Sequence, residues 1–565
     1  MYLRITQRRN QDGSTVAYYA LAENTWNAAA KRSEAQIVHN FGRADQVDRD
    51  GLTRLVDSIS RVLDQGDAIT RGAQEIPQIE LDRVFELGVV LVARTLWEDL
   101  GIGAAIRRCI VEGELTAPHE AALFAMAANR LEQPGSKLAC AMRWLPDIAF
   151  LPDAKGLSVD QLDRALDFLA VWSDRIEREV FLQAADLFRL DVDLIFYDTT
   201  TAYFEIDEAD EQPEEWDGKL YAPLRRRGHS KEGRDNQPQV IIALAVTRDG
   251  MPVRSWVLPG DTADVATVAR IKDDLRAWRL GRCVFVGDAG MYSAENLAAL
   301  SRGLGRYILA VPVRKVKEIE TAVLTRPGRY KPVADNLQVK ELWSARANAA
   351  AATCSASIPR KPYASAFIAS RCSANSMPNS GCCARDEDHP KAACTLLASR
   401  RYGRYLTTDY LGRPRLDAAK VKAAEKFDGK FVVITNDDTL SAEDVALGYK
   451  GAWIIESRFR RMKQTGLEVR PMFHWTPRRI EAHVKLCVLA LQMQRAAEIR
   501  CSLPWARITH ELAALKAVRY HTGGRTIVQR TKIADSLGGI LKRLGVSMPK
   551  QILSVSDPAA DPAAT

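Results

Sequence analysis

The stretch DLIFYDTTTAYFE, residues 193–205, opens with an apolar run typical of a buried strand, and this run ends in Asp198. Residues 282–290, RCVFVGDAG, repeat the pattern, with an apolar run that ends in Asp288. A carboxylate that ends a buried strand lies at the edge of a sheet, beside the start of the next helix. A lone aspartate there is most often a turn former or a helix cap, so neither residue identifies a site by itself.

The segments around these two strands predict a mixed α/β domain. Residues 239–260, QVIIALAVTRDGMPVRSWVLPG, indicate two strands joined by a tight Asp-Gly hairpin. A helix is predicted over 264–278 and a further strand over 306–313. Three strands followed by a β-α-β unit is the order of an RNase H-like core, which a strand over 430–437 and a long helix from Ser441 would complete.

Changes of pattern along the 565 residues predict six regions. Alternating sequence comes first, helical spacing follows, and strands then alternate with helices on both sides of a long insertion. The expected regions are an N-terminal β-hairpin module (1–80), a helical region (81–187), the first half of the RNase H-like core (188–313), the insertion (314–428), the second half of the core with the Glu456 helix (429–500), and C-terminal helices with a disordered tail (501–565). The scattered arginines of the helical region make it a candidate for binding DNA, and a packed helical bundle is the alternative.

The middle of the insertion, residues 344–383, has neither a strand nor a helix period and is rich in Ala, Ser, Cys and Pro. A disordered linker is the ordinary interpretation of such a composition. The cysteines that crowd this stretch form no CxxC pair, so neither a zinc site nor a disulfide framework is expected. We hypothesise instead that part of the segment is translated out of frame, and stop codons in the alternative frame of the gene would refute this.

The segment YKGAWIIESRFRRMK, residues 449–463, predicts a third acid on a helix. Its polar and aromatic residues recur at four-three-four-three spacing, which places them on one stripe of a single helix, beside an apolar stripe. A solvated charged face is the ordinary alternative, but an aromatic pair and one acid amid several cations suit a surface that faces phosphate. The residues of the stripe are Tyr449, Trp453, Glu456, Arg460 and Lys463.

Phosphodiester transfer requires anionic ligands that gather two divalent cations about 4 Å apart. Asp198, Asp288 and Glu456 would supply such ligands, and their hard oxygens favour Mg²⁺ or Mn²⁺. Arg460 and Lys463 are then expected to bind backbone phosphate. Tyr449 or Trp453 would stack on a displaced base.

A second basic segment, RGHSKEGRDNQ over residues 227–237, lies between the first aspartate and the next strand. His229, Lys231 and Arg234 make it a candidate for binding DNA phosphate, and a solvated loop is the alternative.

Taken together, these motifs resemble the DDE transposases of insertion-sequence family four, with their Tyr-Arg-Glu-Lys signature. Tyr449, Glu456 and Lys463 match the signature at the right spacing, whereas Ala452 stands at the Arg position, as in the long-chain subgroup of that family. The resemblance also rests on the segments 193–205, 227–253, 282–290, 396–406, 428–437 and 473–484.

The resemblance implies a bacterial enzyme with an RNase H-like core and a two-ion, Mg²⁺-dependent site. It implies cleavage at terminal inverted repeats, transfer of the 3′ ends to target DNA, and a homodimeric synaptic complex. Two alternatives remain: a catalytically inactive, DNA-binding transposase remnant, and a hydrolytic nuclease that shares the acids.

Composition agrees with these expectations without selecting among them. Lys and Arg number 79 against 71 Asp and Glu, a mildly positive balance that is compatible with a nucleic-acid partner. The sequence contains no GxxxxGK phosphate loop, which argues against an ATP-driven motor. No signal peptide or membrane span is evident, so a cytoplasmic, nucleoid-associated location is expected.

Overall fold

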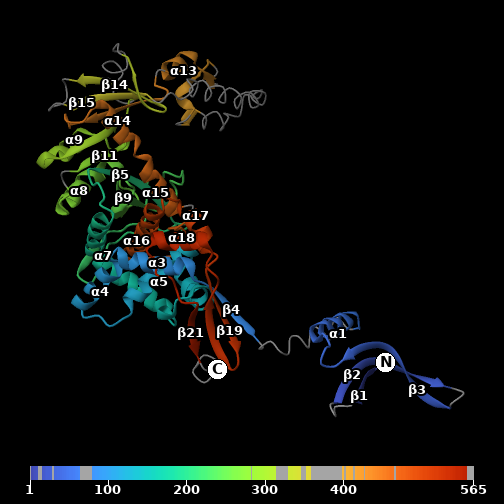
Figure 1. The fold of residues 1–565 in the computed structure, drawn as a ribbon. Helices are drawn as coiled ribbons and strands as arrows, with labels where there is room; N and C mark the ends of the chain where they lie inside the picture. Colours follow the sequence, from blue (N-terminus) through green and yellow to red (C-terminus); the bar gives the residue numbers. More distant parts are fainter. Residues whose placement is uncertain are drawn as a thin grey trace. The chain divides into compact units, whose positions relative to one another are not determined.

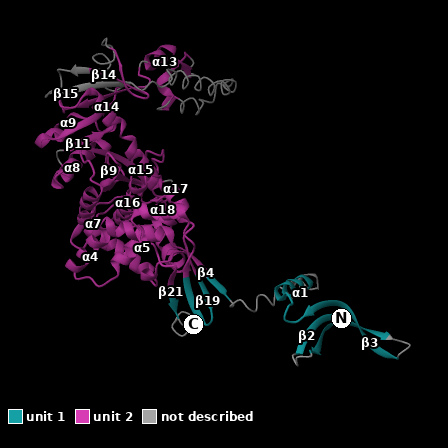
Figure 2. Cartoon of the chain, in the orientation of Figure 1, with its two compact units in different colours: residues 1–82, 519–528, 554–565 teal, residues 83–518, 529–553 magenta. Residues whose placement is uncertain are grey.

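The computed structural model describes residues 2–10, 15–27, 31–63, 79–280, 283–313, 329–344, 351–357, 397–399, 402–410, 414–425, 427–463 and 466–556. Two compact units divide the chain (Figure 2). Unit 1 comprises residues 1–82, 519–528 and 554–565, and unit 2 comprises residues 83–518 and 529–553.

Unit 1 begins with an antiparallel sheet of order β1-β2-β3 (Figure 1). The first two strands form the predicted hairpin, and their register pairs Ile5 with Tyr19. Its elements are β1 (Tyr2–Arg9), β2 (Thr15–Asn27), β3 (Arg32–Arg43) and α1 (Arg49–Leu63).

The main sheet of unit 2 has the order β10-β9-β5-β11-β12-β18-β15-β14-β13, with β8 paired to β9. β9 is antiparallel to both of its neighbours, β5 and β10, whereas β11 and β12 run parallel to β5. The strands are β5 (Leu194–Tyr203), β8 (Arg226–Arg227), β9 (Pro238–Thr247), β10 (Pro252–Pro259), β11 (Val284–Gly287), β12 (Arg306–Val311), β13 (Lys331–Ala334), β14 (Leu337–Ser344), β15 (Ala351–Ser357) and β18 (Lys430–Thr435).

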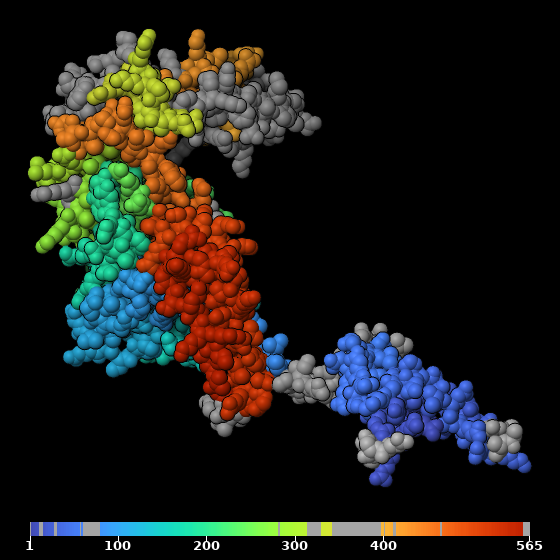
Figure 3. All heavy atoms as spheres, viewed as in Figure 1, coloured from blue at the N-terminus to red at the C-terminus, as the bar shows by residue number. Residues whose placement is uncertain are grey.

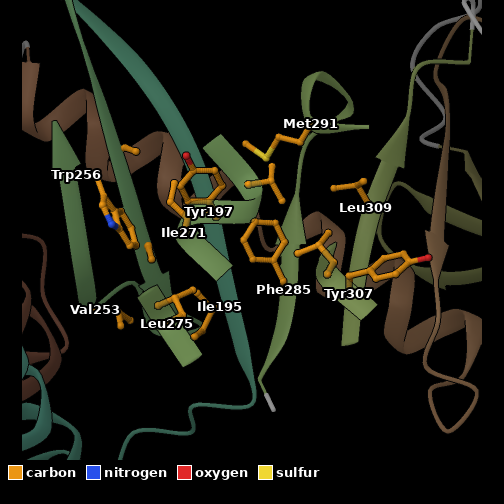
Figure 4. Close-up of a cluster of buried hydrophobic side chains, with 14 of the residues drawn as sticks. Ile195, Tyr197, Val253, Trp256, Ile271, Leu275, Phe285, Met291, Tyr307 and Leu309 are labelled. Carbon is orange, nitrogen blue, oxygen red and sulfur yellow. The ribbon is translucent and has the colours of Figure 1, made fainter. Parts of the chain in front are cut away.

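One face of this sheet carries the apolar core. Tyr197 packs against Phe285 and Trp256, with ring centroids 5.5 and 6.2 Å apart (Figure 4). Ile271 and Leu275 from α8 join the same cluster. The helices on this side are α8 (Asp264–Ala277) and α9 (Ala294–Ser301), and Ser293 caps α9 by accepting the Asn296 N–H.

Phe196 points to the opposite face, because side chains alternate along a strand. There it meets the junction of α14 (Ala442–Lys450) and α15 (Trp453–Lys463). A Cβ at Gly451 would lie 2.8 Å from Cζ of Phe196, so only glycine permits the helices to approach the strand this closely. The single long helix expected from Ser441 is therefore wrong, since the chain breaks into two helices at Gly451.

Helices form a second layer of unit 2. Its long members α7 (Val159–Leu187) and α16 (Pro477–Cys501) pack together, and a capping box at Ser158 begins α7. The C-terminal α17 and α18 pack against α3, where red and light-blue spheres adjoin (Figure 3). The other helices are α3 (Gly88–Asp99), α4 (Ile102–Glu112), α5 (His119–Glu132), α6 (Lys137–Ala139), η1 (Cys140–Ile148), α17 (Trp505–Leu512) and α18 (Asp535–Leu544).

A buried ion pair joins the sheet to this helical layer. Nζ of Lys485 on α16 donates to Oε2 of Glu177 on α7 and to the carbonyl oxygen of Ser255 on β10, both at 2.6 Å. The two charged side chains are only 2% and 3% exposed. Because the ammonium and the carboxylate both have hydrogen-bond partners, the interior tolerates the two charges.

A strand occupies the start of the region expected to be helical from Leu81. β4 (Glu80–Glu86) belongs to a sheet of order β21-β20-β19-β4, because the alternation of ELDRVFE suits a strand. The same sheet corrects the expectation of C-terminal helices alone. Its other strands are β19 (Lys516–Thr522), β20 (Arg525–Arg530) and β21 (Ile552–Ser556).

The expected insertion contributes strands to the main sheet. β15 lies in the stretch predicted to lack any period, and it pairs antiparallel with both β14 and β18. Backbone pairing thus defines a strand that the side-chain pattern does not reveal. Residues 358–396, which include most of the segment hypothesised to be out of frame, lie outside the described residues. Small elements are β6 (Glu214–Trp216), β7 (Lys219–Tyr221), β16 (Leu406–Thr408), β17 (Pro414–Leu416) and α13 (Ala418–Glu425).

Over the described ranges, no helix combines the length and the apolar character needed to cross a bilayer.

Candidate active site

Strand register brings the first two predicted acids together. β5 and β11 are parallel neighbours, with Phe196 opposite Val286. Two residues further along each strand direction stand Asp198 and Asp288, on the same face as that pair. β5 continues to Tyr203, so Asp198 lies within the strand and not at its end as expected.

The Asp198 carboxylate is largely enclosed, with 22% of its side chain exposed. It accepts the Thr199 N–H at 2.7 Å. Burial raises the pKa of Asp198 to about 6, and the nearby Lys231 ammonium opposes this rise.

Asp288 follows β11 and caps the short helix η3 (Ala289–Met291). Its carboxylate accepts the Gly290 N–H at 3.0 Å. Burial raises the pKa of Asp288 as well, again against the influence of Lys231.

A third carboxylate at this place was not predicted. Asp264, the first residue of α8, accepts the Thr199 hydroxyl at 2.5 Å. In the sequence Asp264 looks like an ordinary acid in the first turn of a helix, where the helix dipole favours it. The signal that could have found it is its place just beyond the β9–β10 pair, at the edge where Asp198 lies.

Lys231 lies among these acids. Its ammonium is 3.2 Å from Oδ2 of Asp264 and 3.7 Å from Oδ1 of Asp198. It also donates to the carbonyl oxygen and the hydroxyl of Thr199, both at 2.7 Å. The residue expected to bind DNA phosphate therefore neutralises the acid cluster in this structure.

The loop that carries Lys231 is fixed at its start and in its middle. A Cβ at Gly228 would lie 2.1 Å from the carbonyl oxygen of Gly260, so the two backbones are in direct contact. The Lys231 N–H donates to the Thr201 hydroxyl at 3.2 Å, which ties the loop to β5.

The next residue, Glu232, ties the loop to α15. Its carboxylate accepts hydrogen bonds from Lys463 at 2.7 Å and from Arg470 at 2.6 Å. Only 8% of the Lys463 side chain is exposed, and burial lowers its pKa. Lys463, which was expected to contact phosphate, is thus paired with Glu232 in this structure, because α15 packs against this loop.

Glu456 is exposed on the first turn of α15. Tyr449, at the end of α14, connects it electrostatically to the other acids: burial raises the pKa of Tyr449 to about 12, with Asp288, Glu456 and Asp198 adding to the rise. The Tyr449 ring also packs against Phe431, with centroids 5.2 Å apart.

The remaining predicted DNA contacts are separated. Trp453 is 64% exposed and Arg460 is exposed on α15. The exposed His229 ring lies 3.5 Å from a carboxylate oxygen of Asp235. Arg234 lies over the Tyr203 ring, with its guanidinium carbon 4.5 Å from the centroid.

The donor set fits a hard divalent cation. Asp198, Asp264 and Asp288 present carboxylate oxygens, the ligands that Mg²⁺ and Mn²⁺ prefer, and they already surround a positive charge. Within the described residues, no three acids, histidines or cysteines are grouped closely enough to hold a metal ion.

Comparison with known proteins gives family matches in two regions. A model described as "Transposase DDE domain" matches residues 209–493, which include Asp264, Asp288 and Glu456 but begin after Asp198. A model described as "IS1634 family transposase, N-terminal domain" matches residues 3–73. IS1634 is not family four, so this match names a different insertion-sequence family from the one expected. No curated protein matches the chain.

Among solved structures, the cryo-EM structure of a piggyBac transposase synaptic complex with hairpin DNA is similar. The similarity covers 77% of this chain and 82% of that one, at 8% identity and a TM-score of 0.35. At this distance it carries no argument.

Proposed function

The chain belongs to the transposase DDE domain family, and from this premise we propose that it cleaves DNA at the terminal inverted repeats of an insertion sequence and transfers the 3′ ends to target DNA. The observation that carries the proposal is that Asp198 and Asp288 each stand two residues beyond the paired Phe196 and Val286 of adjacent parallel strands, while Asp264 binds the Thr199 hydroxyl beside Asp198. Clustered carboxylates with little access to water are what metal-dependent phosphoryl transfer requires.

We assign Asp198, Asp288 and Glu456 as the catalytic acids and metal ligands. When bound, two Mg²⁺ or Mn²⁺ ions would supply an activated water or 3′ hydroxyl and stabilise the leaving oxygen. Asp264 holds the Thr199 hydroxyl and so positions the strand that bears Asp198. The break at Gly451 gives α15 a turn about which Glu456 can approach the two aspartates.

The strand order β10-β9-β5-β11-β12 supports an RNase H-like catalytic core, since it has three antiparallel strands followed by two parallel ones. The N-terminal match supports assignment to an IS1634-type insertion sequence. The Tyr449, Glu456 and Lys463 signature remains a proposal for the DNA-facing side of α14 and α15.

We further propose that Trp453 and Arg460, exposed on α15, contact the element end, together with the exposed His229 and Arg234. A homodimer would hold two ends in one synaptic complex. Light scattering with and without end DNA would test that assembly.

An inactive remnant that only binds the inverted repeats is the second candidate, because the segment around residues 344–383 departs from the rest of the chain in composition. Incubating the full chain with a supercoiled plasmid bearing the element ends and Mg²⁺ separates the candidates. Strand transfer supports the proposal, binding alone supports the remnant, and nicking without joining supports a hydrolytic nuclease.

The matched control compares two aspartates. Asp288→Ala should reduce cleavage and joining to background while end binding persists. Asp153→Ala, whose side chain is 81% exposed, should behave as wild type. Cleavage that survives Asp288→Ala would refute the proposed metal site.

A further inference from the structure

The acid cluster of Asp198, Asp264 and Asp288 carries more negative charge than the single ammonium of Lys231 neutralises. One ammonium, on Lys231, lies near three carboxylates, of which Asp264 and Asp198 are 3.2 and 3.7 Å away. The hydrogen bonds of this ammonium go to Thr199, on the same strand as Asp198. The lysine therefore neutralises the cluster as a whole and has no single acid as its dedicated partner.

A divalent cation at Asp198 and Asp288 would meet this ammonium at close range. Two positive charges that share the same carboxylates repel each other, and the repulsion is strong where little water screens it. The lysine and a metal ion therefore compete for the same negative charge.

We propose that Lys231 is the resident counter-ion of the acid cluster in the DNA-free protein, and that divalent cations bind only as its ammonium leaves. The inference rests on the proposed function, because it takes Asp198 and Asp288 as metal ligands. It adds a positioning residue whose role depends on competition with the metal.

The structure indicates which part moves. The Lys231 side chain is 36% exposed on a flexible four-carbon stem, so its ammonium can swing into solvent. The backbone beneath it is held by Thr201 and by the contact of Gly228 with Gly260. Glu232, bound by Lys463 and Arg470, keeps the loop against α15 while the neighbouring side chain departs.

A displaced ammonium gains a new role. Its three donors are released close to the acids, where the scissile phosphate would lie. The expected contact of Lys231 with DNA phosphate and its observed contact with the acids are then successive states of one side chain.

Mn²⁺ titration of the DNA-free full chain, followed by the electron paramagnetic resonance of free Mn²⁺ at pH 8, tests the inference. Lys231→Met should bind Mn²⁺ about tenfold more tightly than wild type, because the competing charge is gone. Lys231→Arg keeps the charge and should bind as weakly as wild type. Lys155→Met, an exposed lysine on another loop, controls for net charge and should also match wild type.

Two results distinguish the failures. Equal or weaker Mn²⁺ binding by Lys231→Met than by Lys155→Met would overturn the inference alone. Mn²⁺ binding by Asp288→Ala that equals wild type, or no binding by any variant, would overturn the proposed metal site and the inference with it.

A thermal measurement covers the case in which Lys231→Met is poorly folded without metal. Mn²⁺ should then raise its melting temperature by more than it raises that of wild type, since the metal replaces the missing charge. An equal or smaller rise would overturn the inference. Glu232→Gln, which loosens the loop and leaves Lys231 in place, should bind Mn²⁺ more tightly than wild type but less tightly than Lys231→Met.

Discussion

Two regions of unit 2 each place a lysine among carboxylates, and they do so in opposite ways. Lys485 lies between α7, α16 and β10, where one glutamate and one carbonyl match its charge at 2.6 Å. Lys231 lies at the edge of β5, partly open to water and surrounded by several acids. The first arrangement is complete and permanent, whereas the second has spare negative charge that another cation could use.

The two arrangements of charge should contribute to different properties of the protein, the first to its stability and the second to its chemistry. Charges in the helical layer are buried with fixed partners, so their removal should affect folding. Charges at the acid edge are shared and accessible, so their removal should affect function more than folding. Four predictions test this division, in order of decreasing effect.

Lys485→Met should destabilise the protein by about 3–5 kcal/mol, because it removes the cation paired with the buried Glu177 carboxylate and leaves the Ser255 hydroxyl as its donor. Urea denaturation measures the change. The double variant Lys485→Met/Glu177→Leu should recover most of the loss. If the double variant is as unstable as the single one, burial of an unpaired charge is not the cause.

Lys137 supplies a pH test of the same layer. It bonds to Nδ1 of His483 at 2.7 Å, and burial, aided by the charge of Arg130, lowers its pKa to about 7. From pH 7 towards the unfolded value near 10.5, the unfolded chain keeps the proton that the folded chain has lost. Stability should therefore rise with pH in this window, by about 2 kcal/mol between pH 7 and pH 9.

The comparison variant for that pH profile is Lys137→Met. Its unfolding free energy should lack the additional rise between pH 7 and pH 9. Parallel profiles for the variant and wild type would show that Lys137 keeps its charge in the folded protein.

Gly451→Ala tests the junction between the two helices at the acid edge. The new methyl would lie 2.8 Å from Cζ of Phe196, so the junction must shift at a cost of about 1 kcal/mol, the low end for overpacking. Because α15 carries Glu456, strand transfer should fall by much more than this loss of stability explains. Gly539→Ala, which has open space, is the control.

Lys231→Met should change stability by about 1 kcal/mol or less, since its ion pairs are partly exposed. Thermal melting in the absence of metal measures this. A loss as large as that of Lys485→Met would abolish the distinction between the two regions.

The sequence predicted those features that depend on local pattern. The apolar runs before Asp198 and Asp288 are long enough to identify buried strands, and β11 lies beside β5 in parallel register, which makes the two acids neighbours. A helix begins after Ser441 as predicted, because Ser441 and Asp444 form a capping box whose partners all lie within one turn.

Features that depend on distant partners escaped prediction. The close packing of Gly451 involves Phe196, more than two hundred residues earlier, and Asp264 looks like any acid at a helix start. Lys231 carries no sign in its own segment that it faces acids from β5 and α8. β15 is defined by its neighbours, because its pattern of small residues favours no particular structure.

The loop that carries Lys231 rests on a contact between the backbones of Gly228 and Gly260. A Cβ on Gly260 would also lie 2.1 Å from the carbonyl oxygen of Gln239, so a side chain at either glycine would force the backbones apart. A methyl group added at either glycine would thus shift Lys231 relative to the acids, although the methyl group contacts none of them.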